Sequence, residues 1–419
     1  PKYNDWLRAQ GIDDENGWET RANSARGVNG EQLSGWLLET NHLPANIPEE
    51  LSETPYMTRR AMEFMEGAGE QPWMCHLSFI KPHWPYIVPA PYHNMYNQDD
   101  VQDLIREAQE RDDAHPVFEA FFNNKIARTF QNDEARNKAI VAYMGLIKQC
   151  DDQLGLILDH LENTGKIKDT IIALTSDHGD YLGDHWLGEK DLFHDVSVKV
   201  PLILYHPDSE FDISRGTICD ALVEQIDLAP TFVEMIGGEV PIHILEGKSL
   251  VPLLRGERPE NWREFVISEY DYSTTPMRKV LELETWQSRL FMVFDGRYKL
   301  MHSAGKHRPM LFDLLEDPNE LKDLGDLEEY DQIIGGLYEK LSEWSRRMAQ
   351  RVTMSENDIL RKTGGALKHG ILVGVHRESD LPPEVTAKYT GLARQIHFEN
   401  QEDIRRHAKI LSKNNKDHI

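Results

Sequence analysis

The chain has 419 residues and 40% of them are hydrophobic, which is enough for one large core and a smaller accessory region. Its formal net charge of −25 argues against a nucleic-acid partner, because such a partner requires a basic face. No apolar run approaches the roughly 18 residues of a membrane span, so we expect no membrane partner. Three cysteines without CxxC spacing indicate neither a disulfide framework nor a zinc knuckle, and reduced thiols favour a cytoplasmic protein.

The first 80 residues contain one predicted helix and one predicted strand. Residues 57–65 have helical spacing, and residues 73–80 alternate between apolar and polar side chains as a strand does. That strand runs into Lys81-Pro82-His83-Trp84-Pro85, where prolines stiffen the loop around His83. A histidine therefore follows directly after a predicted strand end.

The middle of the chain alternates between helices and apolar strands. Residues 139–161 have apolar positions that recur every three or four residues, which predicts a long amphipathic helix. Short apolar runs at 170–175 and 200–205 predict buried strands, and a second helix is expected at 226–236. This order indicates an α/β fold with a mostly parallel or mixed central sheet flanked by helices.

The pattern changes beyond residue 254. Segments 265–270, 289–295 and 297–302 alternate like short strands joined by brief turns, which predicts a small antiparallel sheet with a helix at 331–349 packed on it. We therefore expect three parts. These are an α/β domain at 1–255, a smaller α+β subdomain at 256–350, and a helical or extended arm at 351–419 that joins subunits of a homo-oligomer.

The strongest chemical signal follows the predicted strand at 170–175. Asp177 and His178 fall where that strand ends, which is where open α/β sheets place their ligands. A carboxylate oxygen beside an imidazole nitrogen suits Mn, Ca, Mg or Zn and does not select one of them. Lys190 could supply a point charge to an anionic ester. On composition alone, the same residues also fit a strand-end turn with a capping aspartate and a solvated charge cluster, and His83 fits a histidine that only fixes its loop.

Several motifs occur together in one order along the chain. They are Lys81 to Tyr86, Asp151 to Gly155, Ser176 to Asp180, Leu182 to His185 with Lys190, Val200 to Ile203, Asp227 to Thr231, Gly247 to Leu250, and Leu311 to Leu314. Together they resemble the sulfatase branch of the alkaline phosphatase superfamily, over roughly residues 57–326. Within that branch the chain is most similar to phosphonate monoester hydrolases and arylsulfatases, with choline-type sulfatases as the close competitor.

The resemblance implies an alkaline phosphatase-like α/β hydrolase of small anionic esters. It implies one divalent metal held in part by Asp177 and His178, and a covalent nucleophile that the family makes by oxidising a cysteine to formylglycine. By the same resemblance, Lys190 would contact the nonbridging oxygens of the ester. His83 would donate a hydrogen bond to the substrate or protonate the leaving alkoxide.

The chain departs from the family pattern in two places. The family has two carboxylates on its first strand and a Cys/Ser-x-Pro/Ala-x-Arg nucleophile motif soon after, and neither lies upstream of the motifs found here. We therefore expect this chain to be an N-terminally truncated fragment of a parent protein that carries the formylglycine. The fragment itself is expected to be inactive, because it lacks the nucleophile. A signal peptide could then have been lost with the same segment.

Three functions stay open at this stage. The first is metal-dependent hydrolysis of phosphonate monoesters, phosphodiesters or sulfate esters through a covalent intermediate in the intact parent. The second is a sulfuric ester hydrolase of arylsulfatase or choline-sulfatase type, which changes only the anion. The third is a non-catalytic anion-binding or assembly subunit.

Overall fold

The computed structural model describes residues 2–349, 355 and 357. It divides into two compact units, Pro1–Gly238 with Gly247–Ala349, and Glu239–Glu246 with Gln350–Ile419. The architecture below is that of the first unit. No helix among the described residues is both long enough and apolar enough to cross a membrane. The predicted arm at 351–419 lies almost entirely outside the described residues, and the predicted division near residue 255 stays a prediction.

The N-terminal region is a set of short elements around one small core. Helix α1 (Lys2–Ala9) is followed by a π-helical turn and the antiparallel pair β1 (Ser24–Arg26) and β2 (Gln32–Ser34). Helix α2 (Glu53–Gly67) contains the predicted helix at 57–65, which is confirmed. Tyr3, Leu7 and Ile87 are among the buried residues that join these pieces.

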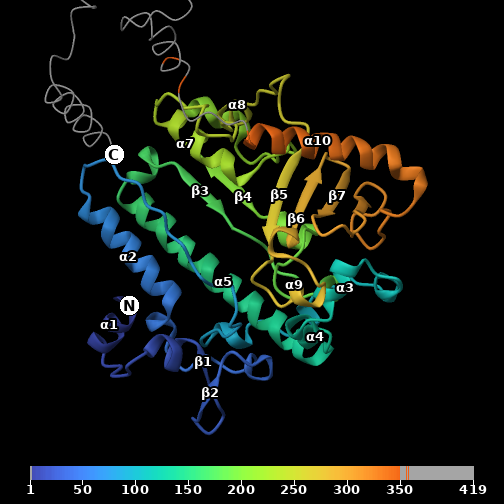
Figure 1. The fold of residues 1–419 in the computed structure, drawn as a ribbon. Coiled ribbons are helices and arrows are strands. Elements are labelled where there is room, and N and C mark those ends of the chain that lie inside the picture. The colour runs from blue at the N-terminus through green and yellow to red at the C-terminus, as the bar shows by residue number, and fades with distance from the viewer. Residues whose placement is uncertain (1, 350–354, 356, 358–419) are drawn as a thin grey trace, which may run out of the picture. The chain divides into compact units, whose positions relative to one another are not determined.

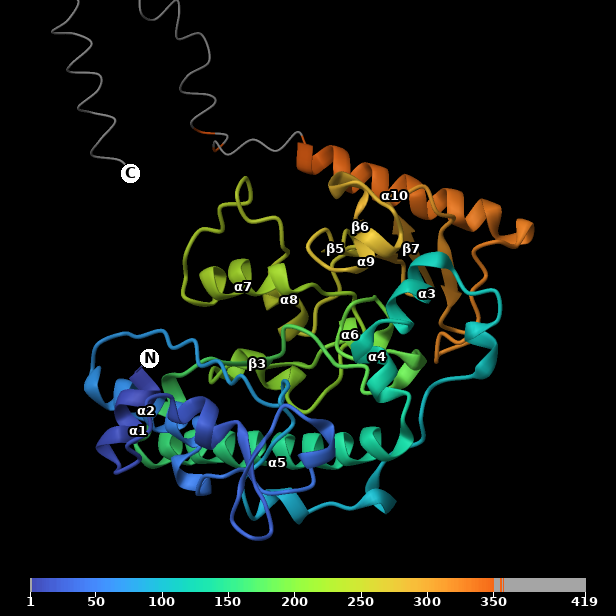
Figure 2. The same ribbon diagram turned by 60° about the horizontal axis from the view of Figure 1, so that its bottom comes forward.

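The longest helix supports the middle of the molecule. Helices α3 (Pro116–Phe122) and α4 (Lys125–Phe130) lead into α5 (Asp133–Asn163), so the helix predicted at 139–161 is confirmed and is longer at its N-terminal end. Asn132 caps α5 by accepting a hydrogen bond from the Ala135 amide, and Gly165 takes a left-handed conformation just beyond the other end. In Figures 1 and 2, α5 runs along one side of strand β3.

The central sheet of the described residues has two strands, β3 (Ile172–Thr175) and β4 (Leu202–Tyr205). Both were predicted. They pair antiparallel, with Ile172 opposite Tyr205 and Thr175 opposite Leu202, which a mixed sheet allows and a wholly parallel sheet does not. They are also less buried than predicted. Ile203 on β4 is 60% exposed, because no described element covers that side of the strand.

The strand predicted at 73–80 does not form in the described part of the chain. Side chains there do alternate, since Trp73, Cys75 and Leu77 pack in a cluster with α2 and α5 while Met74 is 77% exposed. However, the backbone of 72–79 makes no hydrogen bond to any described residue. The prediction was wrong because it read the side-chain pattern, and a strand also needs a hydrogen-bonded neighbour.

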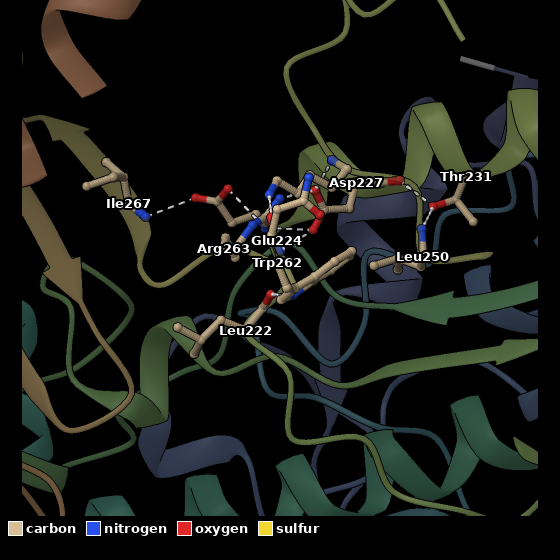
Figure 3. Close-up of polar contacts among 10 residues, drawn as sticks. Leu222, Glu224, Asp227, Thr231, Leu250, Trp262, Arg263 and Ile267 are labelled. Atoms are coloured by element: carbon tan, nitrogen blue, oxygen red, sulfur yellow. Dashed lines mark hydrogen bonds and ion pairs between the residues drawn. The ribbon is translucent and has the colours of Figure 1, made fainter. Parts of the chain in front are cut away.

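Three short helices follow the central strands, α6 (Asp195–Val198), α7 (Leu228–Met235) and α8 (Val251–Leu254). The helix predicted at 226–236 is confirmed as α7. A buried ion cluster holds this region to the segment before β5 (Figure 3). Arg263 pairs with both Asp227 and Glu224, and the Glu224 carboxylate accepts a hydrogen bond from the Ile267 amide at 2.9 Å. Asp227 is fully buried and also accepts from the Lys248 amide at 2.7 Å.

The C-terminal sheet is complete and antiparallel, as predicted, with one strand more than expected. Its order is β5 (Val266–Asp271), β6 (Arg289–Phe294), β7 (Tyr298–Ser303) and β8 (Met310–Asp313), with α9 (Met277–Val280) between β5 and β6. Helix α10 (Asp331–Ala349), predicted at the same residues, covers one face (Figures 1 and 2). Val293, Leu300 and Leu311 are fully buried on this face. The other face packs on α3 through Leu290, Met292 and Met301.

A buried lysine joins this sheet to α6. Lys299 on β7 is 1% exposed and its ammonium lies 2.6 Å from an Asp195 oxygen and 2.7 Å from a Glu320 oxygen. Glu320 also accepts a hydrogen bond from the Asp195 backbone amide at 2.6 Å. Because one ammonium balances two carboxylates, the three residues form a paired network and not an isolated buried charge.

Candidate active site

The loop after β3 brings Asp177 and His178 to the end of the central sheet. Its next residue, Gly179, lies directly against α6, where its amide donates to the Ser197 carbonyl at 2.7 Å. A β-carbon at position 179 would lie 1.9 Å from the Val196 carbonyl oxygen, which no side chain can tolerate. The absence of a side chain at Gly179 is therefore what lets this loop seat on α6 and fixes the two polar residues before it.

Lys190 approaches the same place from the other end of this loop. Its ammonium donates a hydrogen bond to His83 Nε2 at 2.6 Å and lies 3.2 Å from a Glu189 oxygen. Its carbonyl accepts from the Ser197 hydroxyl at 3.0 Å, so α6 anchors both Gly179 and Lys190. The lysine side chain stays partly exposed and can reach a solute.

His83 is held by a loop that closes on a buried lysine. Lys81 donates to the Pro85 carbonyl at 2.6 Å and to Asn23 Oδ1 at 3.1 Å. Because the side chain has left water without an ion-pair partner, burial lowers the pKa of Lys81 to about 8. The bond from Lys81 to Pro85 spans His83 and Trp84, and so fixes the loop from which the histidine projects.

The two histidines have the same tautomer. His83 Nδ1 lies 3.0 Å from the Trp84 carbonyl and His178 Nδ1 lies 2.7 Å from the Gly179 carbonyl, so both Nδ1 atoms must donate. Each neutral ring therefore presents an unprotonated Nε2. The ring centroids are 5.8 Å apart, so the two Nε2 lone pairs belong to one site.

The structure thus brings together all four residues selected from the sequence. Lys190 contacts His83, His83 neighbours His178, and Asp177 Oδ2 lies 3.8 Å from His178 Nε2. Two parts of the chain far apart in sequence supply them, the loop at 81–85 and the two ends of the loop at 176–190. The arrangement offers one cation, two imidazole acceptors and one carboxylate beside an open surface.

These residues fit a divalent metal in kind but not in number. Asp177 offers a hard oxygen and His178 a free Nε2, which are ordinary metal donors. Within the part of the chain that the structure describes, no group of three or more His, Cys, Asp or Glu side chains gathers to hold a metal ion. Asp177 and His178 therefore supply two donors of a shell that needs further ones.

Two partly buried carboxyls near the site were not selected as site residues from the sequence. Asp180 accepts hydrogen bonds from the Tyr86 hydroxyl and the Leu182 amide, and burial raises its pKa to about 6. Asp191 accepts from the Tyr270 hydroxyl at 2.9 Å, and burial raises its pKa also. Their proximity to the SDHGD and EKD motifs could have pointed to them. Their burial could not be read from the sequence.

Three other residues near the motif lie in a separate, structural network. His185 donates to Glu110 at 2.7 Å, and its ring stacks on His194 at 4.0 Å between centroids. His194 Nδ1 accepts from the Tyr181 hydroxyl at 2.8 Å, and Asp184 accepts from the Ile105 amide at 2.9 Å. These hydrogen bonds and ring contacts join His185, His194 and Asp184 to Glu110, Tyr181 and Ile105.

Comparison with known proteins gives two overlapping family matches. The Sulfatase family matches residues 4–238, and the family described as N-sulphoglucosamine sulphohydrolase, C-terminal, matches residues 183–347. A curated relative from Trinickia caryophylli, the multifunctional alkaline phosphatase superfamily protein PehA, is 32% identical over 75% of this chain and 65% of its own length. An arylsulfatase from Clostridium perfringens is 27% identical over 70% of this chain and 57% of its own.

Solved structures agree on the fold. The phosphonate monoester hydrolase SpPMH from Silicibacter pomeroyi has a TM-score of 0.73 at 26% identity, over 85% of this chain and 69% of that one. The phosphonate monoester hydrolase of Agrobacterium radiobacter has a TM-score of 0.71 at 26% identity, over 84% and 69%. These similarities confirm the alkaline phosphatase-like fold class.

The chain spans 65% and 57% of the length of the two curated relatives named above, so what those whole proteins do is not transferred by the match alone. The matched region nevertheless covers residues 4–238 and every predicted site residue. The chain belongs to the sulfatase family of ester hydrolases, within the alkaline phosphatase superfamily.

Proposed function

We propose that this chain supplies the lysine–histidine side of a site that hydrolyses phosphonate monoesters, phosphodiesters or sulfate esters. The observation that carries the proposal is the 2.6 Å contact between Lys190 Nζ and His83 Nε2, beside Asp177 and His178. A chain with a net charge of −25 must attract an anionic ester locally, and Lys190 is the cation at this place.

Lys190 would bind the nonbridging oxygens of the tetrahedral anion. Its ammonium has three protons, and the structure shows it contacting His83 and Glu189 while remaining partly exposed. A point charge here stabilises the oxygens most where negative charge accumulates in the transition state.

His83 would handle the proton on the leaving-group side. Since its Nε2 accepts from Lys190 in the structure, the neutral ring must first take up a proton before it can protonate a departing alkoxide. The donor bond from Nδ1 to the Trp84 carbonyl persists in both protonation states, so the ring keeps its orientation.

Asp177 and His178 would contribute to a divalent metal site, together with donors from elsewhere. When bound, such a metal polarises the ester oxygens and favours the alkoxide form of a nucleophile. The family resemblance implies a formylglycine as that nucleophile, forming a covalent intermediate. Manganese, calcium, magnesium and zinc all accept this donor pair.

A second candidate is an anion-binding subunit without turnover, and one observation favours it. Three hydroxyls near the motif donate to backbone carbonyls and are not directed at the site. Ser176 donates to the His178 carbonyl, Ser197 to the Lys190 carbonyl, and Thr175 to the Pro201 carbonyl. None of these three is poised as a nucleophile.

The test measures turnover and binding together. The chain is loaded in turn with Mn, Ca, Mg and Zn, and hydrolysis of p-nitrophenyl phenylphosphonate and p-nitrophenyl sulfate is followed alongside calorimetric binding of phenylphosphonate. We expect Lys190→Ala to weaken phenylphosphonate binding by about tenfold or more, and any hydrolysis that the metal-loaded chain performs to fall by about 10²- to 10³-fold in kcat/KM. Lys199→Ala is the matched control, because this lysine is 79% exposed and should change kcat/KM less than twofold.

The outcomes separate the candidates. Loss of turnover and of binding in Lys190→Ala, but not in Lys199→Ala, supports the hydrolase. Binding that depends on Lys190 without turnover under any metal supports the anion-binding subunit. If the wild-type chain and both variants bind phenylphosphonate equally and none turns over, the site assignment is wrong.

A further inference from the structure

Glu189 contacts the lysine of the candidate active site. One of its carboxylate oxygens lies 3.2 Å from the Lys190 ammonium, which also donates to His83 Nε2 at 2.6 Å. The Glu189 side chain is 26% exposed and that of Lys190 is 31% exposed, so solvent reaches both groups. A carboxylate therefore lies beside the place where Lys190 would bind an anionic ester.

The backbone of Glu189 has a conformation that residues with a β-carbon disfavour. Its φ is 60°, in the left-handed region that glycine adopts most easily. The Glu189 carbonyl accepts a hydrogen bond from the Tyr181 amide at 2.8 Å, which holds the turn in place. Glycine would suit this turn better, so the presence of a glutamate points to a role for its side chain.

Two neighbouring carboxyls have other partners. Asp180 accepts a hydrogen bond from the Tyr86 hydroxyl, and Asp191 accepts one from the Tyr270 hydroxyl at 2.9 Å. Burial raises the pKa of both carboxyls. Of the three acidic residues around Lys190, Glu189 is the one whose carboxylate forms an ion pair with the ammonium.

The ion pair limits how far Glu189 can lie from a bound ester. An ester oxygen that accepts a hydrogen bond from Lys190 Nζ lies about 2.8 Å from this nitrogen. Because a Glu189 oxygen lies 3.2 Å from the same nitrogen, the two oxygens can be no more than about 6 Å apart. At a partly exposed site, repulsion over this distance lowers affinity roughly three- to tenfold for each negative charge of the ligand.

We propose that Glu189 makes the candidate active site selective for monoanionic esters against dianionic phosphate monoesters. This selectivity rests on the proposed function, in which Lys190 binds the nonbridging oxygens. Sulfate esters, phosphonate monoesters and phosphodiesters each carry one negative charge, whereas a phosphate monoester carries nearly two at neutral pH. A lysine alone would favour the dianion, and the carboxylate beside it offsets that preference.

The test compares phenyl sulfate with phenyl phosphate, which have similar shapes and differ in charge. Calorimetry measures the binding of each ligand to the full chain at neutral pH without added metal, and then to Glu189→Gln, which removes the charge but keeps the length of the side chain. Because the Coulomb energy is proportional to the ligand charge, the gain in affinity for phenyl phosphate should be close to the square of the gain for phenyl sulfate. We expect gains of about ten- to hundredfold and about three- to tenfold, respectively.

Two further variants control for folding and for net charge. Glu189→Gly removes the same carboxylate and suits a φ of 60°, so it should fold and should change the ratio of the two affinities in the same direction. Glu260→Gln makes the same change in net charge at an exposed side chain, so the ratio should stay at its wild-type value. Thermal midpoints of all variants check folding.

Four outcomes decide between selectivity and site assignment. If Glu189→Gln and Glu189→Gly raise both affinities by the same factor, or change neither, the proposed selectivity is wrong. A wild-type chain that binds phenyl phosphate more tightly than phenyl sulfate also overturns it. In these cases the proposed function stands as long as Lys190→Ala loses both ligands. If neither ligand binds, or Lys190→Ala binds both as the wild type does, the proposed function fails together with the selectivity.

Discussion

The two sheets of this protein differ in how completely they are built. In the C-terminal sheet four strands pair in sequence order, α10 covers one face and α3 packs on the other, and Leu300 is fully buried. The central sheet has two described strands, half-buried side chains, and Ile203 60% exposed. The candidate active site lies at the end of the less complete sheet.

The difference shows that these two regions depend on the described residues to different degrees. The C-terminal sheet buries its own apolar residues and pairs its own backbone, so its stability is local. Of the two central strands, β3 packs Ile172 into the cluster with α5, and most residues of both strands are only partly buried. Stability of the site region therefore depends on the few contacts that tie it to the rest, such as Gly179 on α6.

The largest expected contrast is in amide exchange. Amides in β6 and β7 lie inside a four-stranded sheet and should exchange at least about 10³-fold more slowly than amides of 73–79, which have no backbone partner among described residues. Hydrogen–deuterium exchange by mass spectrometry on the full chain measures both rates. Equal rates in the two regions would remove the contrast between the sheets.

Disruption of the buried ion cluster of Asp227, Glu224 and Arg263 should cause the next largest effect, a loss of stability. Asp227→Ala leaves Arg263 buried beside Glu224 with half of its partners lost, and we expect a decrease in the free energy of unfolding of about 3–5 kcal/mol. Urea denaturation measures it. Asp271→Ala is the control, because its pair with Arg289 is exposed and should contribute less than about 1 kcal/mol. Similar decreases in the free energy of unfolding in both variants would show that the buried cluster stabilises the protein no more than an exposed ion pair does.

Truncation of an apolar side chain should destabilise the protein more in the C-terminal sheet than in the central sheet. Leu300→Ala removes a fully buried side chain of β7 and should lower the free energy of unfolding by about 3 kcal/mol. Ile203→Ala removes a side chain that is 60% exposed, so a change below about 1 kcal/mol is expected. Chemical denaturation of both variants checks this. If Ile203→Ala matched Leu300→Ala, the outer side of β4 would be covered in solution.

Acid should weaken the C-terminal region through one histidine. His115 caps α3 by accepting from the Val117 amide and donates to the Arg308 carbonyl, and burial lowers its pKa to about 4. The unfolded chain, with a histidine pKa near 6.5, takes up the proton first as the pH falls. This stability is therefore complete above about pH 6.5 and is lost between about pH 6.5 and 4, by about 2 kcal/mol at pH 4.5.

The measurement compares thermal midpoints of the wild type and His115→Asn across this pH range. Asparagine can still cap α3 but does not titrate, so the variant should lose the His115 share of the pH dependence. His42→Asn, at an exposed histidine, should keep it. A wild-type profile that is unchanged in His115→Asn would contradict the assignment.

The sequence predicted what depends on local pattern and motif order. The helix at 139–161, the C-terminal strands and the four site residues follow from periodicity or from a motif, and the structure has those elements and brings His83, Lys190, Asp177 and His178 together. The direction of pairing between β3 and β4 was not predictable, because apolar runs carry no information on their partner.

The environments of single polar residues could not be predicted from the sequence either. Lys81 looks like an ordinary loop lysine, yet it is buried and closes the loop that holds His83. Asp180 and Asp191 look like solvated charges of an acidic chain, yet hydroxyls of distant tyrosines bind them. The tyrosines that bind the two aspartates are more than 75 positions away in the chain, which pattern analysis cannot connect.

The buried Lys299 has a consequence for how this protein can be divided. Its ammonium balances Asp195 on α6, and α6 holds both Gly179 and the Lys190 carbonyl. A protein ending near residue 255 would keep the exposed Lys199 beside Asp195 but would lose Lys299, the buried one of the two lysines that pair with Asp195 beneath the candidate active-site loop. The C-terminal sheet is therefore not an exchangeable module, and chimeras that graft another sheet onto residues 1–255 must also carry a lysine at the position of Lys299.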